Sequence, residues 1–285
     1  MSALSLSRAT LLLPRQEQRP SPMPVIDLGR LISLDAPTRS RAVDDIATAC
    51  RDLGYFQVIN HGISQSVMDG AVEAASEFFK LPSETKEEFA SDDLRQPTRE
   101  YMGNYAVEVR RVALQLMEAI LEGLGLGKDQ YMHDKFQEGL QMLAVNGYPK
   151  VSQGAPTKGL GPHSDYGFLT VLLTDRPGLE VADRNSNTWK KVLQLPHALD
   201  VHVGDHMEVL SNGRIKTVVH RAVLNPNEAR ISVASIHGFA MHENTTRMID
   251  ICTGWESPLA PGFPPGATNP RLKGYPFSTG LNNRC

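Results

Sequence analysis

Three side chains in the second half of the chain could hold a metal ion together. His163 and Asp165 are two residues apart within a region of alternating hydrophobicity, and such residues point to the same side of a strand. His220 follows on a later predicted strand. Two imidazoles and one carboxylate suit Fe(II) and leave coordination positions open, whereas a structural zinc site usually has a fourth ligand.

A second group of residues predicts an anion site close to this metal. Arg230 and Ser232 are two apart on the strand after His220, and Asn146 and Tyr148 form a similar pair earlier in the chain. A buried arginine is costly without an anionic partner, and its planar guanidinium matches a carboxylate with two hydrogen bonds. The predicted ligand is a small dicarboxylate, bound at one end by Arg230, Ser232 and Tyr148 while the other end chelates the iron.

Each of these short motifs also occurs by chance, and only their order, spacing and strand context favour the functional interpretation. His202 and His206 have the spacing of a helical metal pair, but they lie in a strand-and-turn pattern. We therefore interpret them as core or surface histidines that do not converge. The chain has no GxSxG nucleophile elbow and no GxGxxG after a strand, which excludes the usual serine hydrolase and Rossmann signatures.

The elements that must position these residues change in character along the chain. The first half predicts a strand over 24–32, a strand over 55–60 and helices over 41–53, 64–80 and 100–124, because apolar residues recur at helical spacing and Gly or Pro follows. From Leu143 onward, short alternating runs separated by turn residues predict an antiparallel sandwich or barrel. Asn212 and Gly213 predict a type I′ hairpin turn, with His220 on the strand that leaves it.

Composition excludes several classes of protein. The 285 residues carry a net charge of -3, which argues against binding to a nucleic-acid backbone, and no apolar run is long enough to span a membrane. Three scattered cysteines fit a reducing compartment, and we expect the cytoplasm rather than an organelle. No obligate protein partner is readable. Gly254 to Cys285 is rich in Pro and Gly and predicts a poorly packed tail.

Seven segments resemble one family. They are PVIDL, CRDLGYFQVINHGI, NGYP, GPHSDYGFLTVLLTDRPGLEV, VHVGD, LSNGRIKTVVHRAV and ARIS, and they span most of residues 24–243. The chain resembles the plant 2-oxoglutarate- and Fe(II)-dependent dioxygenases, which include flavanone 3-hydroxylase, anthocyanidin synthase, gibberellin oxidases and salicylate hydroxylases. The resemblance implies a mostly β fold with flanking helices, in which a double-stranded β-helix, or jelly roll, forms the core.

The expected organisation is a mainly helical region over 1–142 that packs on the core, a jelly-roll region over 143–243 and an atypical tail over 244–285. The resemblance implies Fe(II), 2-oxoglutarate and O2 as cofactor and cosubstrates, with ascorbate as a candidate reductant. It implies a small plant metabolite as the substrate, such as a flavonoid, phenolic or hormone, which is hydroxylated or desaturated.

Carried over by position, the resemblance assigns roles to the candidate metal ligands and to the residues of the candidate anion site. It implies iron ligation by His163, Asp165 and His220, and 2-oxoglutarate binding by Arg230 and Ser232 with Tyr148 and Asn146. The segment between Pro82 and NGYP is shorter than the family pattern, and the tail departs from it. The alternative hypothesis is therefore a truncated, catalytically impaired form that binds metal and 2-oxoglutarate without productive substrate oxidation.

Overall fold

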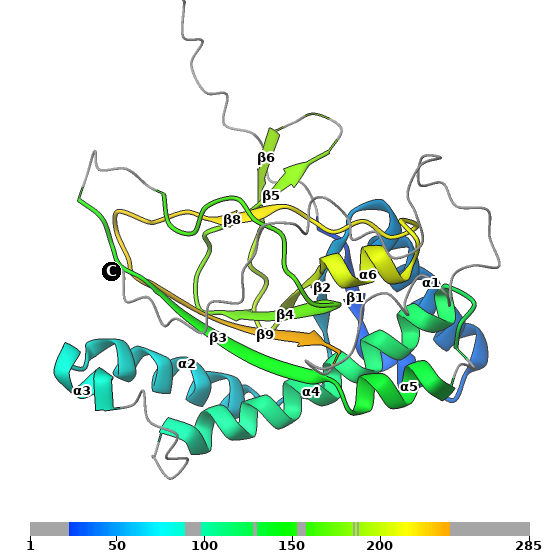
Figure 1. Cartoon of the computed structure of the whole chain (residues 1–285), viewed down its shortest axis with the longest axis horizontal. Helices are drawn as coiled ribbons and strands as arrows, with labels where there is room; N and C mark the ends of the chain where they lie inside the picture. Colours follow the sequence, from blue (N-terminus) through cyan, green and yellow to red (C-terminus); the bar gives the residue numbers. More distant parts are fainter. Residues whose placement is uncertain are drawn as a thin grey trace, which may run out of the picture.

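A computed structural model of the protein describes residues 23–88, 98–127, 130–152, 158–184, 186 and 188–239. Two β-sheets lie face to face, and long helices cover the outside of the larger sheet (Figure 1). The tail predicted over 244–285 lies outside the described residues. Within the described ranges, every helix is too short or too polar to cross a membrane.

The helices of the first half cover the large sheet. They are α1 (Ala36–Asp52), α2 (Gln65–Lys80), α3 (Ser83–Glu88), α4 (Thr98–Gly123) and α5 (Gln130–Gln137). Helix α1 begins earlier than the predicted start at residue 41, because the Asp35 side chain accepts a hydrogen bond from the Thr38 backbone and caps the helix there. The apolar stripe predicted for α4 is confirmed, since its five members are fully buried: Tyr105, Val109, Val112, Leu116 and Ile120.

The large sheet has six strands in the order β1-β2-β7-β4-β9-β3. Its strands are β1 (Val25–Asp27), β2 (Tyr55–Ile59), β7 (Leu199–Val203), β4 (Leu169–Thr174), β9 (Arg230–Gly238) and β3 (Leu140–Tyr148). All neighbours are antiparallel except β1 and β2. The strand predicted over 24–32 is only three residues long, because the Asp27 side chain accepts from the Gly29 amide and caps a short 3₁₀ helix (Leu28–Ile32).

The small sheet has the order β6-β5-β8, and its strands are β6 (Thr188–Lys191), β5 (Leu179–Asp183) and β8 (His220–Ala222). The segment that leads to His163 runs antiparallel beside β8, with bridges from Lys158 to Val223 and from His163 to His220. Two facing antiparallel sheets with helices on one of them agree with the jelly-roll core that the resemblance implies.

Alternation along the strands gives the large sheet two different faces. The outer face packs on the helices through apolar side chains such as Phe56, Val171 and Leu199. The inner face meets the small sheet through a smaller apolar cluster that includes Leu172 and Val181. Between them the inner face carries six buried polar side chains: Gln57, Thr170, Asp200, His202, Arg230 and Ser232.

The hairpin predicted around Asn212 and Gly213 is wrong. The residues before it form helix α6 (Asp205–Leu210), and both Asn212 and Gly213 have positive φ angles of 51° and 75°. These angles would also suit a type I′ turn, but here they end a helix. The Gly213 amide donates to the Glu208 carbonyl, which is the hydrogen bond of a Schellman motif at a helix C-terminus. The chain then reaches His220 without a strand over 211–219.

Candidate active site

Backbone pairing places His163, His220 and Asp165 together. His163 and His220 exchange two backbone hydrogen bonds of 3.0 and 2.9 Å, which sets the two imidazoles beside each other on neighbouring segments. The Asp165 carbonyl accepts from the Asp205 amide at 2.8 Å, so the turn that carries Asp165 is attached to the start of α6. Each candidate ligand is therefore held by main-chain contacts.

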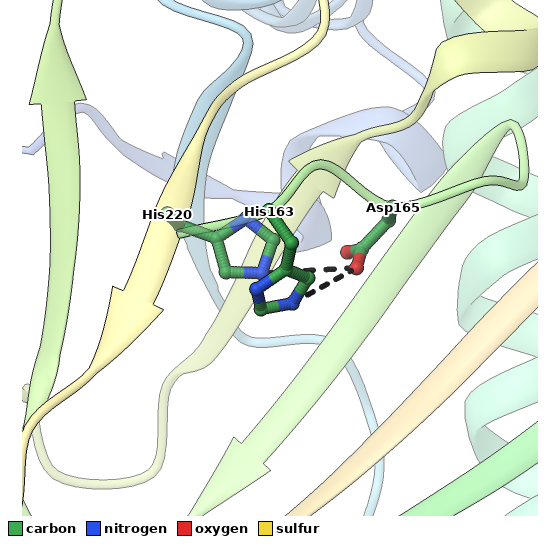
Figure 2. A group of neighbouring side chains, drawn as sticks. All are labelled: His163, Asp165 and His220. Carbon is green, nitrogen blue, oxygen red and sulfur yellow. Dashed lines mark ion pairs between the residues drawn. The ribbon is translucent and has the colours of Figure 1, made fainter. Parts of the chain in front are cut away.

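Figure 2 shows the three side chains turned toward one point. His163 Nε2 lies 3.8 Å from Asp165 Oδ1, and His220 Nε2 lies 3.7 Å from the same oxygen. The imidazole centroids are 4.3 Å apart. One ligand atom from each residue falls within 4.8 Å of the others, a spacing at which all three can reach one ion.

The ring orientations leave the correct nitrogens free for a metal. His163 Nδ1 lies 2.8 Å from the Gly161 carbonyl oxygen, and His220 Nδ1 lies 3.4 Å from the Val218 carbonyl oxygen. A carbonyl oxygen only accepts, so Nδ1 carries the proton in both rings and Nε2 keeps its lone pair. This is the arrangement in which an outer carbonyl fixes the tautomer of a metal-ligating histidine.

The protonation states also suit a cation. Burial, with a smaller contribution from the nearby His202, lowers the pKa of His220 to about 3, so this imidazole is neutral at pH 7. Burial would raise the pKa of Asp165, but His202 and His220 outweigh that effect and hold it below its usual range. Metal binding requires neutral imidazole and ionised carboxylate, and both are present before a metal arrives.

Arg230 lies on the inner face of the large sheet, at the start of β9. Its side chain is buried, its Nε donates to the Arg176 carbonyl at 2.9 Å, and its guanidinium carbon lies 5.0 Å from the centre of the Tyr148 ring. Burial lowers the pKa of this guanidinium, with Tyr148 and Asp200 opposing the shift. Among the described residues no carboxylate forms an ion pair with Arg230, and a buried, unpaired guanidinium favours an anionic ligand.

Strand register brings the other predicted residues to Arg230. Tyr148 lies directly opposite Arg230, and Asn146 lies directly opposite Ser232, in the antiparallel pair of β3 and β9. Residues opposite each other in such a pair share one face of the sheet. The four side chains predicted to bind a dicarboxylate therefore lie on the inner face of the large sheet, which also carries His202, whereas His220 lies on β8 of the small sheet.

Comparisons with known proteins decide the family. The family model described as "non-haem dioxygenase in morphine synthesis N-terminal" matches residues 23–143. The model of the 2OG-Fe(II) oxygenase superfamily matches residues 139–238. Flavanone 3-dioxygenase 3 of Oryza sativa subsp. japonica is 65% identical, with 82% of this chain and 83% of the rice protein covered. The chain belongs to the plant 2-oxoglutarate- and Fe(II)-dependent dioxygenases.

Other relatives of this dioxygenase agree. The rice protein named 2-oxoglutarate-dependent dioxygenase 21, chloroplastic, is 52% identical over 79% of this chain and 78% of its own. A solved complex of an Arabidopsis thaliana dioxygenase for auxin oxidation with 2-oxoglutarate superposes with a TM-score of 0.68 at 27% identity, covering 78% of this chain and 94% of that one. The jelly-roll fold is thereby confirmed, and the cofactor and cosubstrates of the family are Fe(II), 2-oxoglutarate and O2.

His202 and His206 are both buried, in agreement with their interpretation as core or surface histidines, but the sequence did not predict that one of them adjoins the site. His202 lies on β7 with its Nδ1 3.6 Å from Asp165 Oδ2 and its ring 4.3 Å from that of His220, so it adjoins the site. His206 does not, because it packs between Tyr166 and Phe168. The signal that could have found His202 is the alternation in LDVHV, where two polar residues share one side of a fully buried strand.

Proposed function

We propose that this dioxygenase binds Fe(II) through His163, Asp165 and His220 and oxidises a small plant metabolite, with hydroxylation or desaturation as the outcome. The observation that carries the proposal is the convergence of two Nε2 lone pairs on one carboxylate oxygen, with both Nδ1 atoms occupied by backbone carbonyls. Two nitrogens and one oxygen are the donor set of the facial triad that serves non-haem Fe(II) oxygenases.

The cosubstrate end of the proposal rests on Arg230. Its buried guanidinium would bind the distal carboxylate of 2-oxoglutarate, with the Ser232 and Tyr148 hydroxyls beside it and Asn146 on the metal side. The keto-acid end would then extend toward the histidines, between the two sheets. When bound, iron and 2-oxoglutarate would supply the oxidising chemistry, and the protein would position the two next to each other and exclude water from them.

A flavanone is the first substrate to test. The support is the rice relative at 65% identity, whose name states that activity, and auxin is the second choice because a structural neighbour is named for auxin oxidation. The broader proposal is therefore a flavonoid, phenolic or hormone. Identity of this level extends over most of both chains, which favours a related substrate.

The test is aerobic turnover of the purified chain with Fe(II), 2-oxoglutarate and each candidate substrate. Mass spectrometry of the products and a succinate assay follow the reaction, and His220→Ala provides the control. The expected result is succinate formed together with a product that has gained one oxygen or lost two hydrogens. A folded, iron-loaded chain that forms neither succinate nor product would overturn the proposal.

A second candidate function is the impaired form, which binds metal and 2-oxoglutarate without productive oxidation. In its favour, the alignment with the rice relative is 273 positions long, but it contains only 82% of the 285 residues of this chain, which is fewer than 273. The relative therefore has internal residues without a counterpart here. Succinate released with no oxidised product, across the whole substrate panel, would favour this second function.

A further inference from the structure

His202 is a buried imidazole whose contacts within the described residues leave it unsatisfied. It is 1% exposed, and neither of its ring nitrogens has a hydrogen-bond partner. A buried polar group without a partner costs free energy, so its presence calls for a ligand or a contact that forms in another state of the site. Its position on the inner face, next to the proposed iron ligands, suggests which contact that is.

The two oxygens of Asp165 face different neighbours. Oδ1 faces the Nε2 atoms of His163 and His220, whereas Oδ2 faces His202 Nδ1 at 3.6 Å and has no hydrogen-bond partner itself. The distance exceeds a hydrogen bond by a few tenths of an ångström. A small rotation of the carboxylate or the ring would close it, and the two orphaned atoms, one donor and one acceptor, would satisfy each other.

We propose that His202 is a positioning residue whose Nδ1–H donates to Asp165 Oδ2, so that the carboxylate offers Oδ1 alone to the metal. This inference rests on the proposed function, because it requires Asp165 to be an iron ligand. With Oδ2 engaged, Asp165 occupies one coordination position, and the remaining positions stay free for the cosubstrate and O2. His202 is not a fourth ligand, since its nitrogens are not among the atoms that converge.

The surroundings of His202 fix the ring for this task. Thr170 and Tyr55 lie directly opposite it on the two flanking strands, β4 and β2. Val201 and Val203, its neighbours in the strand, point into the apolar core on the other face. The imidazole therefore faces Asp165 and His220, which is the direction in which its nitrogen must donate.

The decisive variants are His202→Asn and His202→Gln. The Asn side-chain amide places an N–H where His has Nδ1, whereas the longer Gln amide reaches the place of Nε2. Both are polar and similar in size to His, and His206→Asn is the matched control, because His206 is another buried histidine with two unpartnered nitrogens. The variants are compared as full chains, with thermal unfolding measured for each.

Fe(II) affinity is measured anaerobically by competition with a chelator, followed by the absorption band that appears when 2-oxoglutarate is added. We expect His202→Gln to bind iron about 10- to 100-fold more weakly and to shift the band, as for the loss of an outer-shell contact. His202→Asn and His206→Asn should stay near the unaltered chain. Equal iron affinity in the Gln and Asn variants, whether both normal or both weak, would overturn the inference. Failure of the unaltered chain to bind iron would overturn the proposed function instead.

Discussion

The two faces of the large sheet are formed by the same strands but differ in the side chains that they carry. On β7, Leu199, Val201 and Val203 enter the apolar core under the helices, while Asp200 and His202 between them face the small sheet. Both faces are buried, yet the outer one is mainly apolar, with Ser235 and His237 as buried polar exceptions on β9, and the inner one collects Asp200, His202 and Arg230. The comparison teaches that residues that stabilise the core alternate along a strand with residues available for chemistry. Substitutions at neighbouring positions should therefore have different consequences.

The largest effect is expected for His220→Ala on β8, where the imidazole lies 4.3 Å from that of His202 on the inner face. Loss of an outer-shell contact lowers metal affinity by up to roughly 100-fold, and removal of one of three ligands should lower it by more. We therefore expect the variant to bind no Fe(II) under ordinary conditions. Metal content after gel filtration with stoichiometric Fe(II) measures this. Stoichiometric iron in the variant would show that these three residues do not hold the metal together.

Arg230→Ala should affect the other end of the proposed site, on the inner face of the large sheet. Loss of the buried guanidinium should weaken 2-oxoglutarate by about 2 to 5 kcal/mol, on the order of 30-fold to several thousand-fold, and leave iron binding nearly intact. Calorimetric titration of 2-oxoglutarate into the iron-loaded chain measures the change. Arg230→Lys is the control, which keeps the charge and loses the two-pronged geometry. An unchanged 2-oxoglutarate affinity in the Ala variant would refute the arginine contact.

The outer face should respond in the opposite way. Leu199→Ala removes a fully buried side chain next to Asp200 and should lower the free energy of unfolding by about 2 to 5 kcal/mol. Urea unfolding measures the loss. The folded fraction should bind Fe(II) and 2-oxoglutarate as the unaltered chain does. A selective loss of ligand affinity without loss of stability would contradict the division between the faces.

The smallest effect is expected for Ser232→Ala. The hydroxyl lies beside Asn146 in the register of β3 and β9 and would contribute one hydrogen bond to the carboxylate. Its removal should weaken 2-oxoglutarate by about 0.5 to 1.5 kcal/mol, or roughly 2- to 13-fold. The same titration resolves this, and a loss as large as that of Arg230→Ala would mean that the hydroxyl has a further structural role.

Much of this arrangement could be predicted from local patterns. The stripe on α4 has helical periodicity, and the end of α2 is set by Pro82, so both helices were predicted within a few residues. The ligand candidates were found with the rule that residues two apart on a strand share a face, although His163 forms only an isolated bridge and Asp165 lies outside any strand. Register then adds what spacing could not, namely that Tyr148 lies opposite Arg230.

Other features depend on contacts distant in the sequence. Asn212 and Gly213 adopt the positive φ angles that a hairpin needs, but helix α6 before them is set by its packing, since Met207 and Leu210 are fully buried. The role of His202 was missed because its significance comes from Asp165, which belongs to a segment outside β7. No periodicity within DVHVGDH reveals that neighbour.

An anaerobic titration with Fe(II) and then 2-oxoglutarate tests the central claim most directly, because it requires both ends of the proposed site at once. The account predicts a visible charge-transfer absorption of a chelated keto acid that saturates at one 2-oxoglutarate per chain. A soluble, folded sample that binds neither ligand, and shows no such absorption, would contradict it.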